Sequence, residues 1–142
     1  MRIKSKDFGE IDIDDSSIIE FKDGMLGFGI FKKYALINIE NEGFESFFCL
    51  QSIDEPALSF IIVDLSQLIP EYDPLVDEHI LKNADFDINS IEIYNTITLS
   101  DTIEHTTVNL KAPIIINANK GVQVICQNDD YSVKSRLFKE LV

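Results

Sequence analysis

The side chains with the greatest potential for catalysis or metal binding in this sequence are two histidines and two cysteines. His79 and His105 lie far apart in the chain, and neither has a cysteine or a second histidine at the spacing of a zinc site. No Gly-x-Ser-x-Gly elbow is present, and Cys49 and Cys126 have no recognisable catalytic neighbourhood. We therefore expect no metal, no cofactor and no catalytic residue.

Both cysteines lie within apolar runs that are typical of strands. Residues 1–6 are basic, but no apolar run follows them as it would in a secretory signal. The most apolar window, residues 58–65, is too short to cross a bilayer core of about 30 Å. These features indicate a cytoplasmic protein without a membrane segment. They favour two reduced core thiols and leave a disulfide between them open.

The glycines at 24–29 do not form a phosphate-binding loop, because they lack the GxGxxG spacing and no Lys-Ser/Thr pair follows. They indicate a turn before Phe28 and Phe31. The numerous carboxylates leave two alternatives open. One is a carboxylate-dependent enzyme with a β-barrel fold, which needs an apolar pocket around a desolvated Asp or Glu. The other is a small ligand-binding barrel, which bulky Ile and Phe side chains disfavour because they fill a narrow interior.

The charge is strongly negative and unevenly distributed. Acidic residues number 25 against 12 basic ones, for a net charge of −13, and residues 7–110 hold 22 of the acids but only 4 basic side chains. Such a surface repels phosphate backbones, so we expect no direct contact with nucleic acid. It favours fast, salt-sensitive association with a basic partner, although net charge also serves ordinary solubility.

The chain length of 142 residues suits a single domain over 1–142. Alternating apolar residues around 10–14, 34–39 and 91–99 predict strands with one wet face. Residues 58–63 and 112–116 are apolar on both parities and therefore need cover on both sides, which a closed or nearly closed barrel with a helix laid on it would supply. Turns at 40–43 and 118–121 end in glycine and predict hairpins.

One segment has helical periodicity. Asp73 can cap a helix and Pro74 can occupy its first position, and one face then carries Val76, Ile80, Leu81 and Ala84. Residues 131–142 suit either a short helix or an extended tail. The predicted fold class is mainly β: a small antiparallel, barrel-like domain with one short α-helix at about 74–84 and one of these two forms at the C-terminus.

The best candidate for a binding surface is the segment that leads into this helix. Large apolar side chains ringed by carboxylates are typical of a protein interface. The predicted partner-binding residues are Leu65, Leu68, Ile69, Glu71, Tyr72 and Asp73. The alternative is that the apolar members plug one end of the barrel. A second candidate is an exposed strand edge near Pro113, unless the proline protects that edge.

Three segments carry a resemblance to a known family. Residues 47–60 and 106–117 each have a strand, an amide, a proline and a second strand, and Gly24-Met25-Leu26-Gly27-Phe28 precedes them. In this order they resemble the bacterial flagellar assembly factor FliW. That family commonly has Gly-Leu-Pro-Gly-Phe at the third segment, and Leu26 stands here in place of its proline. The matched motif residues, most of them structural, are Gly24, Gly27, Phe28, Leu50, Gln51, Ser52, Pro56, Asn109, Leu110, Ala112, Pro113, Ile114 and Asn117. Gln51 and Asn109 are expected to satisfy backbone groups at strand ends.

The resemblance implies a cytoplasmic, non-enzymatic chaperone that takes part in flagellum biogenesis. It implies two protein partners: newly made flagellin, and CsrA, a small basic RNA-binding repressor of flagellin translation. Flagellin would occupy the protein until export removes it, after which the protein would capture CsrA and relieve repression. We expect the free protein to be a monomer.

Overall fold

The computed structural model describes residues 1–39 and 45–138 of the chain. Most of the regular elements are short strands, with one α-helix, α1 (Glu78–Asn83), and 3₁₀ turns at Asp15–Ser17 and Ile103–His105. The strands are β1 (Arg2–Ser5), β2 (Gly9–Asp12), β3 (Ile18–Phe21), β4 (Lys33–Asn38), β5 (Phe47–Ser52), β6 (Ser59–Val63), β7 (Glu92–Thr98), β8 (Thr107–Val108), β9 (Ile114–Asn117), β10 (Lys120–Gln123) and β11 (Ser135–Arg136).

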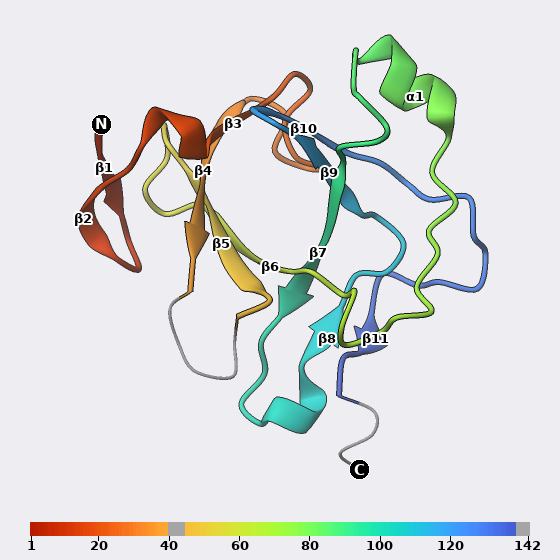
Figure 1. The fold of residues 1–142 in the computed structure, drawn as a ribbon. Helices are drawn as coiled ribbons and strands as arrows, with labels where there is room; N and C mark the ends of the chain where they lie inside the picture. The colour runs from red at the N-terminus through yellow and green to blue at the C-terminus, as the bar shows by residue number, and fades with distance from the viewer. Residues whose placement is uncertain (40–44, 139–142) are drawn as a thin grey trace.

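Seven strands close into a barrel. Their order is β7-β6-β5-β4-β3-β10-β9, and β9 pairs again with β7 to complete the ring (Figure 1). Every pairing in the ring is antiparallel except that of β10 with β3, which is parallel. β8 and β11 extend the sheet beyond β7, and β1 and β2 form a separate hairpin beside the barrel. The predicted mainly-β, barrel-like fold is confirmed.

The barrel interior is filled by apolar side chains from every strand of the ring except β10. Tyr34, Leu50 and Ile62 are completely buried there, and the Phe21 and Tyr34 rings meet edge to face with their centroids 5.5 Å apart. Such a filled core is characteristic of a small barrel with bulky inward side chains.

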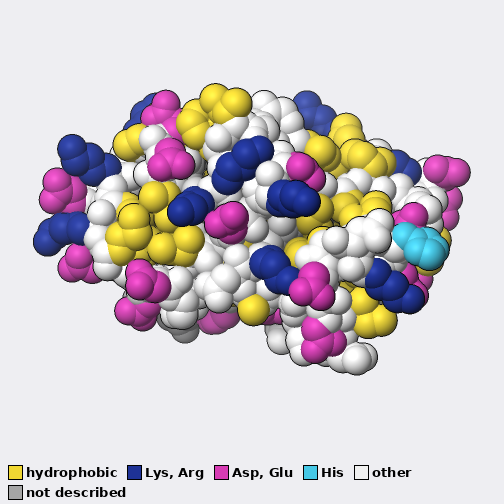
Figure 2. All heavy atoms as spheres, turned by 90° about the horizontal axis from the view of Figure 1, so that it is seen from above, with side chains coloured by type: hydrophobic (Ala, Val, Ile, Leu, Met, Phe, Trp, Pro, Cys, Tyr) yellow, Lys and Arg dark blue, Asp and Glu magenta, His cyan; other side chains and the backbone are white. Residues whose placement is uncertain are grey.

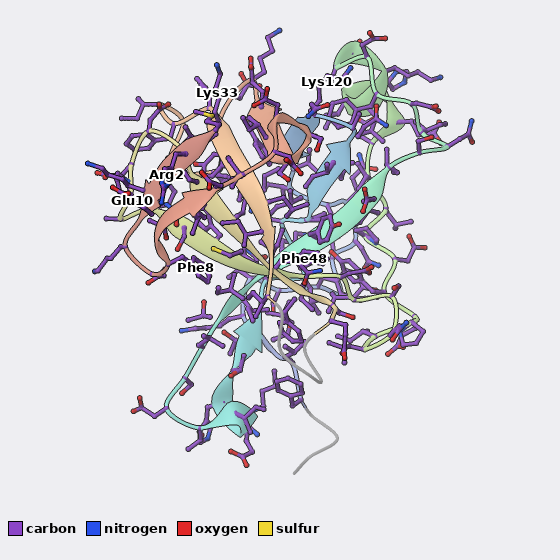
Figure 3. The ribbon with its side chains drawn as sticks, turned by 60° about the vertical axis from the view of Figure 1, so that its left-hand side comes forward. Arg2, Phe8, Glu10, Lys33, Phe48 and Lys120 are labelled. Atoms are coloured by element: carbon purple, nitrogen blue, oxygen red, sulfur yellow. The ribbon has the colours of Figure 1, made fainter. Side chains whose placement is uncertain are left out.

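The outer face of the barrel is covered in three places. The β1–β2 hairpin covers β5, where Ser5 Oγ donates to Gln51 Oε1 at 2.8 Å. The segment after β6 and the C-terminal segment pack over Val63, Ile97 and Val108. Helix α1 packs through Leu81 against Ile115, so β9 is buried on both faces as its sequence predicts. The hairpin also carries an Arg2–Glu10 ion pair at 3.5 Å, visible in Figure 3, whose exposure leaves it little energetic weight.

This cover explains where the prediction of one wet face is wrong. In β4 the consecutive residues Tyr34 and Ala35 are both completely buried, and in β7 Tyr94 and Asn95 are 4% and 0% exposed. One of each pair faces the interior and the other lies beneath a covering element. The alternation of apolar and polar residues showed only which side chains are polar. Whether the outer face of a strand is buried depends on the elements that pack against the outside of the barrel.

The predicted start of the helix is also wrong. The N-cap is Asp77, whose Oδ1 accepts from the His79 backbone N–H at 2.9 Å, because Leu75 adopts a left-handed φ of +52° that a helix cannot include. At the C-terminus, β11 pairs with β8, so a helix across residues 131–138 is wrong and the extended form is correct. Residues 139–142 lie outside the described residues.

The hairpin between β9 and β10 uses a different left-handed residue from the one expected. Ala118 adopts φ +54°, whereas Gly121 lies within β10. Gly121 serves packing instead, because a Cβ there would stand 2.5 Å from Cζ of the Phe21 ring. The other expected turn, 40–43, lies outside the described residues. The two cysteines are free and buried, as predicted.

We predict that Gly121→Ala lowers the free energy of unfolding by about 1–3 kcal/mol, because the new methyl group must displace a core aromatic ring. Urea denaturation followed by circular dichroism measures this change. Gly29→Ala is the matched control, since a Cβ at that position meets only the Asp23 carbonyl oxygen at an ordinary 3.5 Å. Equal stability of the two variants would contradict the proposed role of Gly121.

Candidate protein-binding site

The segment that follows β6 is folded into two successive turns. The Ser66 backbone N–H donates to Asp64 Oδ1 at 3.0 Å, and the Ile69 N–H donates to the Leu65 carbonyl at 2.8 Å. The Tyr72 N–H then donates to the Ile69 carbonyl at 3.0 Å. These local bonds satisfy the backbone of a chain that has left the sheet.

Three of the six predicted partner-binding residues face the barrel. Leu65 is 3% exposed, and Ile69 and Tyr72 are half-buried against the same apolar cluster. The Tyr72 hydroxyl donates to the Leu110 carbonyl at 2.7 Å and accepts from Asn95 Nδ2 at 2.9 Å. Burial raises the pKa of Tyr72 to about 12, against a smaller lowering effect of the Asn95 hydrogen bond. These side chains anchor the segment to the barrel.

The other three predicted residues face outward. Leu68 is 42% exposed, and Glu71 and Asp73 are exposed beside it. Of the six predicted residues, the structure therefore exposes one apolar side chain and two carboxylates, on a segment whose other side chains anchor it to the barrel. Within residues 45–110 the sequence has 13 acidic side chains and a single basic one, so the segment lies in the most acidic part of the chain.

A notch of about 400 Å³ lies between this segment and the first half of β7. Asp64, Leu65 and Ser66 line one side of it, and Glu92 and Ile93 line the other. A larger groove of about 920 Å³ lies between residues 22–29, the end of α1 and β10. Figure 2 shows the molecule from above, where lysine and arginine side chains alternate with acidic and hydrophobic ones. That face has no single sign of charge.

The motif amides hold loops at the ends of strands. Gln51 is completely buried, and its Nε2 lies 3.1 Å from the Ser52 and Leu58 carbonyl oxygens and 3.2 Å from that of Pro56. Asn109 Oδ1 accepts from the backbone N–H groups of Lys111 and Ala112, each at 3.0 Å. Asn117 Oδ1 accepts from the Asp87 N–H at 3.1 Å. All three side chains replace backbone partners that the adjoining turns cannot supply.

The Gly24–Phe28 motif forms a tight turn. The Phe28 N–H donates to the Met25 carbonyl at 2.8 Å, and Gly27 has φ +85°, the geometry of a type II turn in which proline suits the position that Leu26 occupies. In this chain the Leu26 N–H instead donates to Gln123 Oε1 at 2.9 Å. A proline could not make that bond, so the turn is fixed here by Gln123.

The structure contradicts the second candidate surface. Pro113 precedes β9, which pairs with β10 on one edge and with β7 on the other, so no free strand edge is present there. Sequence reasoning missed the notch beside β7, because its only local signal is Asn95, a polar residue on the apolar parity of its strand. Within 1–39 and 45–138, no group of three or more His, Cys, Asp and Glu could hold a metal ion. No helix among these residues is long and apolar enough to cross a membrane.

The fold places this chain in the class of small, closed β-barrel proteins. Comparison with known proteins identifies the family. The model of the FliW protein family matches residues 2–137. The chain is 37% identical to the flagellar assembly factor FliW of Lachnospira eligens, over 97% of this chain and 95% of that one, and 39% identical to that of Caldanaerobacter subterraneus, over 99% and 95%. A solved crystal structure of the flagellar assembly factor FliW matches with a TM-score of 0.88 and 34% identity, over 100% of both chains.

The chain belongs to the FliW family of flagellar assembly factors. The family assignment and the mainly-β barrel therefore agree with the resemblance seen in the sequence.

We predict that Tyr72→Phe lowers the free energy of unfolding by about 1–3 kcal/mol, because it leaves the Leu110 carbonyl and the Asn95 amide without the hydroxyl they share. Tyr131→Phe is the control. Its hydroxyl accepts from the Asp73 N–H in an exposed bond at 2.9 Å, and the loss of this bond should cost less than about 0.5 kcal/mol. Chemical denaturation of both variants measures the difference, and a neutral Tyr72→Phe would show that the segment is not anchored through this hydroxyl.

Proposed function

We propose that this protein is a cytoplasmic, non-enzymatic flagellar chaperone that switches between two protein partners. It binds newly made flagellin, and when export removes flagellin it binds the translational repressor CsrA and relieves repression of flagellin synthesis. The proposal treats residues 1–142 as one domain that is monomeric when free and that makes no direct contact with nucleic acid or membrane.

The observation that carries this proposal is full-length membership of the FliW family. The match covers 95% of the length of two relatives that are flagellar assembly factors, which supports carrying their role over to this chain. The charge supports the second partner. An excess of 13 acidic residues over the chain attracts a basic RNA-binding protein and repels the RNA that this partner carries.

We assign partner contacts to the segment that contains Leu68, Glu71 and Asp73. Leu68 provides an exposed apolar anchor, and the two exposed carboxylates that follow it in the chain would contribute charge at the rim of the interface. The proposed partner-binding set also includes Leu65, Ile69 and Tyr72. These side chains pack against the barrel and so fix the position and orientation of the segment that carries Leu68. The motif residues at 24–28, 51–56 and 109–117 serve the scaffold.

Titration calorimetry of the purified protein with flagellin and with CsrA from the same organism tests the function directly. We expect each to bind with a dissociation constant in the micromolar range or tighter, and we expect bound flagellin to reduce the binding of CsrA. Failure of both partners to bind would overturn the proposal.

The electrostatic part of the proposal predicts a salt-dependent association rate with CsrA. We expect this rate constant to fall about tenfold or more between about 0.05 M and 0.5 M sodium chloride, because ions screen the attraction between separated charges. Stopped-flow fluorescence measures the rate. An association rate that does not change with ionic strength would exclude electrostatic steering. It would not contradict the proposal that this protein binds CsrA.

Replacing Leu68 by alanine is expected to weaken partner binding by about 1 kcal/mol or more, roughly fivefold, without changing the melting temperature. Leu99→Ala is the matched control, because Leu99 is 66% exposed and lies outside the proposed surface. Calorimetry of both variants with each partner provides the comparison. If the two substitutions have the same effect, Leu68 is not an anchor.

A further inference from the structure

Strand β6 pairs with only half of its neighbour β7. The last paired residues are Val63 and Asn95. Beyond them the Asp64 N–H still bonds the Ser46 carbonyl on the β5 side at 2.9 Å, whereas the Leu65 carbonyl, next on the β7 side, is used within its own turn. β7 continues without β6, because Glu92–Tyr94 pair with β9 on the opposite edge.

The direction of the backbone groups follows from one hydrogen bond. The Thr96 carbonyl accepts from the Asn109 N–H at 2.9 Å, on the edge of β7 that carries β8 and β9. Backbone groups of successive residues in a strand face opposite edges, so Tyr94 and Glu92 face that same edge. The N–H and C=O of Ile93 therefore face the edge that β6 has left. This edge borders the notch.

One residue that lines the notch, Asn95, also has a buried acceptor without a partner among the described residues. Asn95 is completely buried, with Nδ2 donating to the Tyr72 hydroxyl and to the Asn109 carbonyl, each at 2.9 Å. Those two bonds fix the orientation of the amide. Its Oδ1 has no hydrogen-bond partner in the part of the chain that the structure describes. A buried acceptor without a partner is unfavourable, so this amide is sensitive to any change in the lining of the notch.

The charge around the notch has one sign. Asp64 and Glu92 line it, and none of the described lysines or arginines does. Glu71 and Asp73 are exposed on the segment that forms its outer side. An occupant that carries positive charge is therefore favoured over a neutral or acidic one.

We propose that the notch binds a short extended segment of a basic protein, which adds to the free edge of β7 as an extra strand. Its backbone pairs with Ile93, and its lysine or arginine side chains lie beside Asp64 and Glu92. Strand addition of this kind draws affinity from the main chain and selectivity from side chains at alternate positions. The inference rests on the proposed function, because it states how a basic partner engages the segment that contains Leu68.

A synthetic probe tests the geometry without any assumption about the natural partner. The probe is a capped hexapeptide that alternates lysine and valine, and its counterpart alternates glutamate and valine. In ¹H–¹⁵N spectra of the full chain we expect the lysine peptide to shift the backbone amides of residues 91–95 and the side-chain amide of Asn95, and to slow hydrogen exchange at Ile93. Absence of shifts along β7, or equal shifts with the glutamate peptide, would overturn the proposal.

Two pairs of variants extend the test to whole partners. Ser66→Trp fills the notch from an exposed position that lines it, whereas Gln67→Trp puts the same ring on a neighbouring residue that does not. Asp64→Asn with Glu92→Gln removes the charge but keeps the acceptor oxygens that bond Ser66 and Tyr94. Asp12→Asn with Asp14→Asn, outside the notch, changes the net charge equally. We expect the first member of each pair to weaken probe binding at least about tenfold and the second to leave it unchanged.

Calorimetry with flagellin and CsrA separates this proposal from the proposed function. The first informative outcome is that the unmodified chain binds a partner, and that the Ser66→Trp variant has an unchanged melting temperature and binds this partner as tightly as the Gln67→Trp variant does. In that case the notch is not the docking site, and the proposed function stands. If neither partner binds the unmodified chain while the lysine peptide does, the proposed function fails and the notch remains a site for basic strands.

Discussion

The structure depends on one strand that changes partners along its length. The first half of β7 pairs with β9, and the second half pairs with β6 on one edge and with β8 on the other. Without the β7–β9 pairing the sheet would remain open, with unpaired edges at β9 and β7. The same change of partner leaves the first half of β7 without β6, and so creates the acidic notch.

Closure of the barrel, together with its covering elements, buries both faces of several strands. It also requires hydrogen-bond partners for the backbone of the loops at the ends of the barrel. Chains that leave a closed barrel must satisfy their backbone groups in loops packed on its surface, where water is scarce. Gln51, Asn95, Asn109 and Asn117 do this as side chains, by bonding carbonyls and N–H groups of the adjoining loops. Buried amides of this kind are costly to leave unpaired, which restricts each loop to one arrangement. The barrel thus presents its surface segments in fixed positions.

The charge and the surface chemistry act over different ranges. The acidic excess of the chain would attract the proposed basic partner from a distance, but exposed charges separated by solvent contribute little to the final affinity. Affinity has to come from contacts at close range. In the proposed mode of binding, the exposed Leu68 and the edge of β7 that β6 leaves would supply such contacts, in the most acidic part of the sequence. A flagellar assembly factor of this form would meet its partner electrostatically and hold it through apolar and main-chain contacts.

The sequence by itself determined the class of fold and the family. Alternating apolar residues, runs that are apolar on both faces, and the prolines Pro56 and Pro113 before strands are all local signals that can be read without knowing the tertiary structure. It also placed the candidate segment at 65–73. Only the tertiary structure decided that Tyr72 faces inward while Leu68 faces outward, that Tyr34 and Tyr94 are buried, and that Asp77 caps the helix. These outcomes depend on which strands meet after the ring closes. The notch beside Ile93 belongs to the same group, since it arises where residues about 30 positions apart in the chain stop pairing, and no local pattern records that point.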